Sequence, residues 1–212
     1  MSEIHQKTAV PAGEAPVDFE PMDRSAFLLK GALAAGALYG ASAVGPLVQR
    51  VFAQGSSGDI DILNFALTLE LLEADFYKTG LEELSLSSNV EKLATEFGDT
   101  EQEHVDALTG AIKDLGGKPV KTPKFEFPIK DEKSFLELAI TFEDTGVSAY
   151  NGAGPMIKSK DLLATAGSIV QIEGRHAGVI RFVAGEEPVV APFDPTLSMD
   201  EVLKAVEPFI KA

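Results

Sequence analysis

The sequence contains one short motif twice, Glu-x-x-His, and few folds can use both copies at once. The first copy places Glu101 three residues before His104, and the second places Glu173 three residues before His176. Residues three apart lie on one face of an α-helix, so each Glu and His pair can hold the same metal ion. The chain has three His, and two of them stand in this motif. The pattern therefore predicts two helices that each offer a carboxylate and an imidazole to a metal.

The motif is part of a longer repeat. Glu70 precedes Tyr77 by seven residues, and Glu143 precedes Tyr150 by seven. The second copy follows the first by 73 residues at these positions and by 72 residues at the Glu-x-x-His motif. Two helix pairs, each carrying Glu…Tyr and then Glu-x-x-His, indicate an internal duplication.

This order of residues resembles the ferritin-like di-metal carboxylate superfamily, and the resemblance covers about residues 59–184. In that fold two helices of a bundle give one Glu each and the other two give Glu-x-x-His. The resemblance implies an all-α four-helix bundle with a long crossover between the second and third helices. It also implies two metal ions with six ligands: Glu70 and Glu143 on one metal each, Glu101 and Glu173 bridging both, and His104 and His176 completing one metal each.

Three further side chains are expected near the ligands. In the family, tyrosines placed like Tyr77 and Tyr150 can hydrogen-bond to ligand carboxylates, so both are expected to support the site. A buried Tyr hydroxyl finds some polar partner in any case, and that reading stays open. Glu73 lies one turn after Glu70 and is a candidate extra ligand, ranked below the six because its counterpart in the second copy is Gly146.

The burial pattern supports a metal site from the residues themselves. Glu70, Glu101, Glu143 and Glu173 each fall within an apolar stripe of helical period, and the stripes contain no Lys or Arg. Burying an ionised carboxylate without a partner costs several kcal/mol. Two divalent cations would balance four carboxylates. Carboxyl groups sharing protons would also reduce the charge, but they leave the Glu-x-x-His spacing unexplained.

The same periodicity predicts where the helices begin and end. A linker rich in Pro and Lys over 117–132 separates the two helix pairs and is expected to run extended along the bundle. A Pro-rich coil follows the fourth helix, and the capping-box sequence at 198–201 starts a short C-terminal helix. The four long helices are expected at 59–84, 89–115, 133–153 (ending at Gly154-Pro155) and 160–184, and the short helix at about 199–210.

The N-terminal 53 residues have the composition of an export signal that follows a disordered segment. A polar stretch is followed by Arg24, a Gly/Ala-rich apolar run over about 31–48, and a small-residue cleavage site after Ala53. The segment resembles a twin-arginine signal, except that Ser25 stands where the second Arg is expected. The apolar run is also just long enough for a membrane anchor. The expected organisation is 1–53 signal, 54–185 bundle and 186–212 tail.

The amino-acid composition limits which metals and which classes of partner the protein can bind. The chain has no Cys, so any metal must be held by Glu, Asp and His, a donor set that suits iron or manganese. The net charge of −15 argues against nucleic acid or an anionic membrane surface as a partner. Contact with a membrane is expected only through an uncleaved signal.

The sequence predicts an exported protein, in the periplasm or at the cell surface, with a di-iron or di-manganese centre. The favoured activity is oxidation of Fe(II) with O₂ or peroxide, with iron sequestration as a further role. The alternatives are peroxide dismutation at two manganese ions, as in manganese catalases, metal binding for stress protection without catalysis, and a structural bundle with an inert site. A monomer or dimer is favoured over a cage, which would be an awkward cargo for export.

Overall fold

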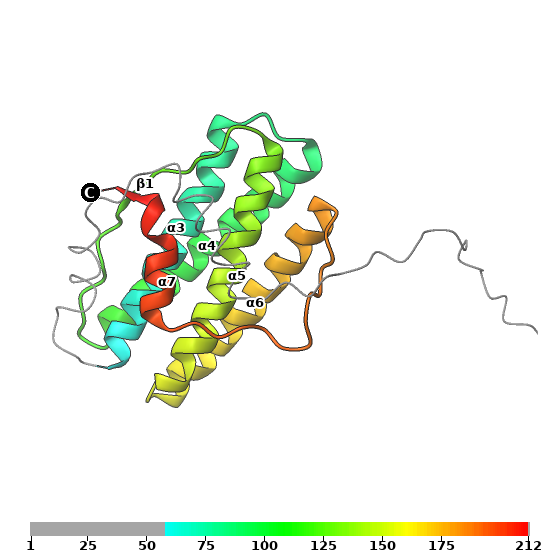
Figure 1. The fold of residues 1–212 in the computed structure, drawn as a ribbon. Helices are drawn as coiled ribbons and strands as arrows, with labels where there is room; N and C mark the ends of the chain where they lie inside the picture. The colour runs from blue at the N-terminus through cyan, green and yellow to red at the C-terminus, as the bar shows by residue number, and fades with distance from the viewer. Residues whose placement is uncertain (1–57, 212) are drawn as a thin grey trace, which may run out of the picture.

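Four long helices form most of the chain that the structure, a computed structural model, describes, which is residues 58–211. Figure 1 shows them side by side: the first is antiparallel to the second and the third is antiparallel to the fourth, while the second and third run parallel. The helices are α3 (Asp59–Glu83), α4 (Ser88–Asp114), α5 (Glu132–Ala153) and α6 (Lys160–Ala184). Each end lies within one residue of its predicted position. The all-α four-helix bundle is confirmed. The predicted signal, its boundary with the bundle and His5, the one His outside the Glu-x-x-His motif, lie outside the described residues.

The helix ends follow from local sequence signals. The Asp131 carboxylate accepts a hydrogen bond from the backbone N–H of Ser134 at 2.8 Å, which fixes the start of α5. At the end of α4, Gly116 has a φ of +76°, a conformation that only Gly adopts without strain. After α5 the chain continues through a short 3₁₀ turn, η1 (Gly154–Met156), at the predicted break.

The crossover between α4 and α5 runs along the outside of the bundle from one end to the other (Figure 1). Asn64 of α3 holds it in place. Its amide donates to the carbonyl of Lys118 at 3.3 Å, and its side-chain oxygen accepts from the N–H of Val120 at 2.7 Å. Further along, β1 (Lys124–Phe125) pairs antiparallel with β2 (Ile210–Lys211). The extended crossover was predicted, but its pairing with the C-terminus was not.

The C-terminal segment packs on the bundle rather than standing apart from it. Helix α7 (Met199–Val206) begins at the predicted capping box, in which Ser198 and Glu201 satisfy each other's backbone N–H groups. The expectation of one helix to about residue 210 was wrong, because α7 ends at Val206 and a 3₁₀ turn, η2 (Glu207–Phe209), follows. Pro208 has no backbone N–H with which to continue the α-helix. The apolar face of α7 lies against α5 and is buried there.

The two ends of the bundle are packed differently. The end that lies under α7 is filled by aromatic side chains, with Phe76 stacked on Phe135 at a centroid distance of 4.9 Å and Phe142 edge-on to Phe76 at 5.0 Å. The other end has a smaller cluster of mainly aliphatic side chains around Tyr150. Between the clusters lies a layer of buried polar side chains. No helix within residues 58–211 combines the length and the apolar character needed to cross a membrane.

Candidate metal centre

All six predicted ligands point into the polar layer of the bundle, with each long helix contributing at least one. The four glutamates have no exposed surface, and His104 and His176 are 8% and 5% exposed. Their donor atoms form two groups of four, within each of which the atoms lie less than 4.8 Å apart. The first group is Glu70, Glu101, His104 and Glu173, and the second is Glu101, Glu143, Glu173 and His176.

Glu101 and Glu173 belong to both groups, as expected of ligands that bridge two metals. The two oxygens of Glu101 face different imidazoles: one lies 2.9 Å from Nδ1 of His104, and the other lies 2.7 Å from Nδ1 of His176. Glu173 lies 3.1 Å from Nδ1 of His104. Glu70 and Glu143 each approach one imidazole, at 3.2 Å and 3.5 Å. The arrangement therefore has the approximate two-fold symmetry of the sequence repeat.

Several buried polar atoms of the cluster lack a hydrogen-bond partner. They include both oxygens of Glu173 and one oxygen each of Glu101 and Glu143. Nδ1 of His176 also makes no hydrogen bond, although it lies in ion-pair range of Glu101. Buried polar atoms in folded proteins are nearly always satisfied, so a cluster of unsatisfied donors to metal points to an ion among them. Their oxygen and nitrogen chemistry fits two divalent cations.

In the cluster without metal, the imidazoles are held in their charged form. Burial lowers the pKa of His104, but its close contacts with the carboxylates of Glu101, Glu173 and Glu70 outweigh burial and raise the pKa to about 12. Burial also lowers the pKa of His176, but its contacts with the carboxylates of Glu101 and Glu143 outweigh burial and raise the pKa to about 9. Burial likewise opposes ionisation of Glu101, yet its close contacts with the imidazoles of His104 and His176 lower its pKa to about 2. The imidazolium groups thus occupy the electrostatic role that metal cations would take over.

The other carboxyl groups are pushed toward their protonated form. Burial, followed by repulsion from Glu101, raises the pKa of Glu70 to about 7 despite its contact with His104. Burial also raises the pKa of Glu143, and it raises that of Glu173 well above the ordinary value. The cluster therefore holds protons at neutral pH, and cations that bind there must displace them.

The two tyrosines connect the halves of the repeat. Tyr77 of α3 donates a hydrogen bond to Glu143 of α5, and Tyr150 of α5 donates one to Glu70 of α3. Burial is the largest cause that raises both tyrosine pKa values well above 10, so each hydroxyl keeps its proton. Each tyrosine supports the carboxylate of the opposite helix, rather than the one seven residues before it. This orients Glu70 and Glu143 toward the two imidazoles.

Glu73 is as buried as the six ligands but belongs to neither group. Its side chain is 2% exposed, and its Oε2 has no hydrogen-bond partner. A Cβ atom added at Gly146 would lie 3.2 Å from Oε1 of Glu73 and 3.4 Å from Oε2 of Glu173. The carboxylate of Glu73 thus occupies space that the second copy of the repeat leaves free at Gly146. Burial and the repulsion of the ligand carboxylates raise its pKa well above the ordinary value.

The sequence did not indicate two neighbours of the ligands. Phe97 stacks on the imidazole of His176 at a centroid distance of 3.8 Å and covers that side of the centre. Arg181 is buried on α6 and forms a two-pronged ion pair with Asp144 of α5, with one contact at 2.7 Å. Because Arg181 is paired with Asp144, it does not neutralise the ligand carboxylates.

A comparison with protein families identifies one match. The profile of the ferritin-like domain family matches residues 58–186, which includes all four long helices and all six predicted ligands. A search of curated proteins finds no match to the chain. The ligand roles of the six residues stay predictions, now with a shared location.

Proposed function

The chain belongs to the ferritin-like domain family, and on that premise we propose that it binds two iron ions and oxidises Fe(II) with dioxygen or peroxide. The observation that carries the proposal is the pair of overlapping donor groups, in which two carboxylates are common to both. Two divalent cations would balance the four ligand carboxylates. With manganese the same residues would suit peroxide dismutation, and the test below separates the two.

Each residue has a defined task in this proposal. Glu101 and Glu173 would bridge the ions, and each remaining Glu would pair with one His on one ion. Tyr77 and Tyr150 hold the terminal carboxylates by hydrogen bonds. When bound, iron would let electrons pass from Fe(II) to dioxygen or peroxide. The buried carboxyl groups with raised pKa values can retain or release the protons that accompany this chemistry.

The experiment is aerobic oxidation of Fe(II) by purified protein loaded with two ferrous ions per chain under argon. We expect the protein to consume Fe(II) well beyond its own two ions, and the Glu70→Ala variant to lose this turnover. Glu103→Ala is the matched control, since Glu103 is exposed beside the centre. Rapid evolution of O₂ from peroxide by the manganese form, with no Fe(II) oxidation, would support the dismutation alternative. Inactivity with both metals would contradict a catalytic role.

We further propose that the chain is exported after folding around its metals. Outside the cell, copper and zinc compete by raw affinity ahead of iron and manganese, so a Glu/His site that folded there would take the wrong ion. Residues 1–58 fused to a fluorescent reporter should carry it out of the cell in folded form, and changing Arg24 to Lys should stop export. Retention of the wild-type fusion inside the cell, or its export unfolded, would contradict this proposal.

A further inference from the structure

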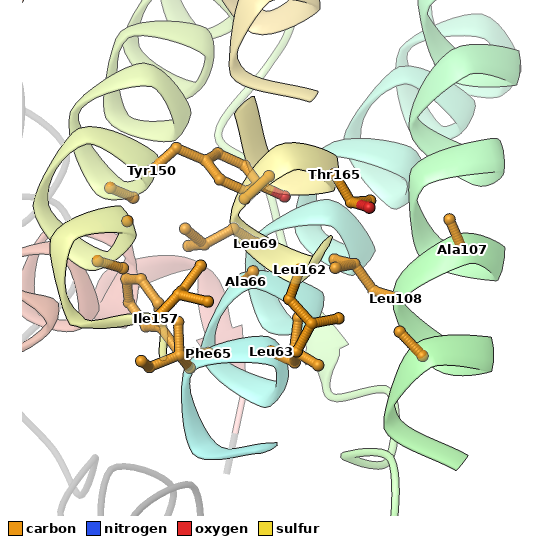
Figure 2. A pocket seen from close by; sticks show the side chains of 16 residues that line it. Leu63, Phe65, Ala66, Leu69, Ala107, Leu108, Tyr150, Ile157, Leu162 and Thr165 are labelled. Carbon is orange, nitrogen blue, oxygen red and sulfur yellow. The ribbon is translucent and has the colours of Figure 1, made fainter. Parts of the chain in front are cut away.

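A cavity of about 50 Å³ lies inside the bundle on the Tyr150 side of the metal centre (Figure 2). All four long helices contribute to its wall, and of the side chains that line it only those of Tyr150 and Thr165 carry polar atoms. A buried water needs two to four polar partners, so this wall favours an apolar guest. The cavity is far smaller than the ~150 Å³ apolar cavity that holds benzene or xenon, so it suits a guest of two or three heavy atoms.

The cavity ends at the metal centre. Tyr150 forms part of its wall, and the hydroxyl of the same residue donates a hydrogen bond to Glu70. Ala66 and Leu69 line the cavity from the helical turn that precedes Glu70. Tyr150 is therefore in contact with both the cavity and the Glu70–His104 half of the centre.

The repeat shows that this space is particular to one half of the molecule. Ile62, Leu69 and Ala149 line the cavity, and the residues at the equivalent places in the other copy are all phenylalanines. These phenylalanines pack against one another and fill the equivalent space beside Tyr77. They are Phe135, Phe142 and Phe76 in the same order. Both halves of the repeat thus carry the metal ligands, but phenylalanines fill the space beside Tyr77 and a cavity remains beside Tyr150.

The half that holds the cavity is also the more accessible one. Ala107 of α4 and Thr165 of α6 line the cavity (Figure 2). Both residues are exposed to solvent, so the cavity opens between these two helices. Their counterparts in the repeat are the larger Val179 and Leu93. Tyr150 is 8% exposed, whereas its counterpart Tyr77 is 1% exposed. A small molecule can therefore approach the centre from the Tyr150 side.

We propose that this cavity is a binding site for dioxygen, through which it reaches the Glu70–His104 half of the metal centre. Dioxygen is apolar, has two heavy atoms and needs no hydrogen-bond partner, which matches the volume and the wall of the cavity. Peroxide, which must keep its hydrogen bonds, has no such reason to enter. The proposal rests on the proposed function for its reaction, but the cavity can be tested without metal.

The first measurement is the structure of metal-free crystals under xenon pressure, since xenon is an apolar probe of apolar cavities. Wild-type protein should bind xenon beside Tyr150. The double variant Ala107→Leu, Thr165→Leu should lose that xenon, because larger side chains would occupy the exposed mouth. Ala149→Phe fills the cavity from within and is a second test, because it copies the residue found in the other half of the repeat. The matched control is Ala164→Leu, an exposed position on α6 that does not line the cavity.

The second measurement is the rate at which the same proteins, loaded with two ferrous ions per chain, react with limiting dioxygen or with peroxide. The double variant should react with dioxygen several-fold more slowly and with peroxide at the wild-type rate, while the control matches wild type in both. Absence of xenon from the wild-type cavity would overturn the proposal, as would an undiminished dioxygen rate in a variant that has lost xenon. Xenon binding in wild-type protein that never consumes dioxygen would refute the proposed function and still support the gas site.

Discussion

Glu73 carries the carboxyl group whose surroundings differ most between the two copies of the repeat. Burial opposes ionisation of this carboxyl most strongly, and repulsion from the charges of Glu173, Glu143 and Glu70 opposes it further. No such carboxyl exists in the second copy, where Gly146 provides room for it instead. A carboxyl with a raised pKa in the folded protein is a source of instability once the pH exceeds the pKa of the unfolded chain.

Replacing Glu73 with Gln should therefore stabilise the metal-free protein at neutral pH. We expect a gain of about 1–3 kcal/mol at pH 7.5 that disappears near pH 4, where the carboxyl is protonated in both folded and unfolded chains. Urea unfolding at the two pH values measures this, with the exposed Glu82→Gln as control. The variant should still bind two metal ions per chain. Loss of one ion would show instead that Glu73 is a ligand.

At the scale of elements, the helices could be predicted because each carries its own signals. The apolar period, the capping residues and the Gly-Gly pair after α4 are all local, and they placed every long helix within one residue. Helix α7 was recognised for the same reason, but its end was missed because Pro208 stops it. The β1–β2 pair was not predictable, since pairing between the crossover and the C-terminus depends on tertiary packing.

The metal site also divides into features with a local sequence signal, which could be predicted, and features that depend on tertiary packing, which could not. The ligands could be found because duplication repeats them at a constant offset, and helical geometry places each Glu and His together. The crossed tyrosine contacts could not, because they depend on how α3 and α5 face each other. The cavity depends on side-chain volumes from four helices, and the stacking of Phe97 on His176 joins two helices. Sequence periodicity carries no information about either.

At the scale of the whole molecule, the buried cluster couples folding to pH and to metal. Glu70, with its pKa raised from 4.5 to about 7, contributes stability that is lost as the pH rises through that interval. His176 has its pKa raised from 6.5 to about 9, so the stability it contributes is complete below pH 6.5 and is lost as the pH approaches 9. The pKa of Glu101 is lowered from 4.5 to about 2, so the stability that Glu101 contributes is complete above pH 4.5 and is lost as the pH falls toward 2.

The metal-free protein should consequently have a lower Tm at pH 8.5 than at pH 5.5. Bound cations should reverse this trend, because they bind deprotonated ligands and compete with protons. Thermal unfolding followed by circular dichroism, with and without two equivalents of Mn(II), tests both parts. A metal-free Tm that rose between pH 5.5 and 8.5 would mean that the buried carboxyl groups are not protonated as inferred.

Elemental analysis tests whether the buried cluster is a two-metal site with bridging carboxylates. Folded protein reconstituted with Fe(II) or Mn(II) and freed of unbound metal should contain close to two ions per chain. Glu101→Ala should lose both ions because Glu101 belongs to both donor groups, while Glu103→Ala should keep both. A double variant His104→Ala, His176→Ala that retained two ions with wild-type affinity would contradict the assignment.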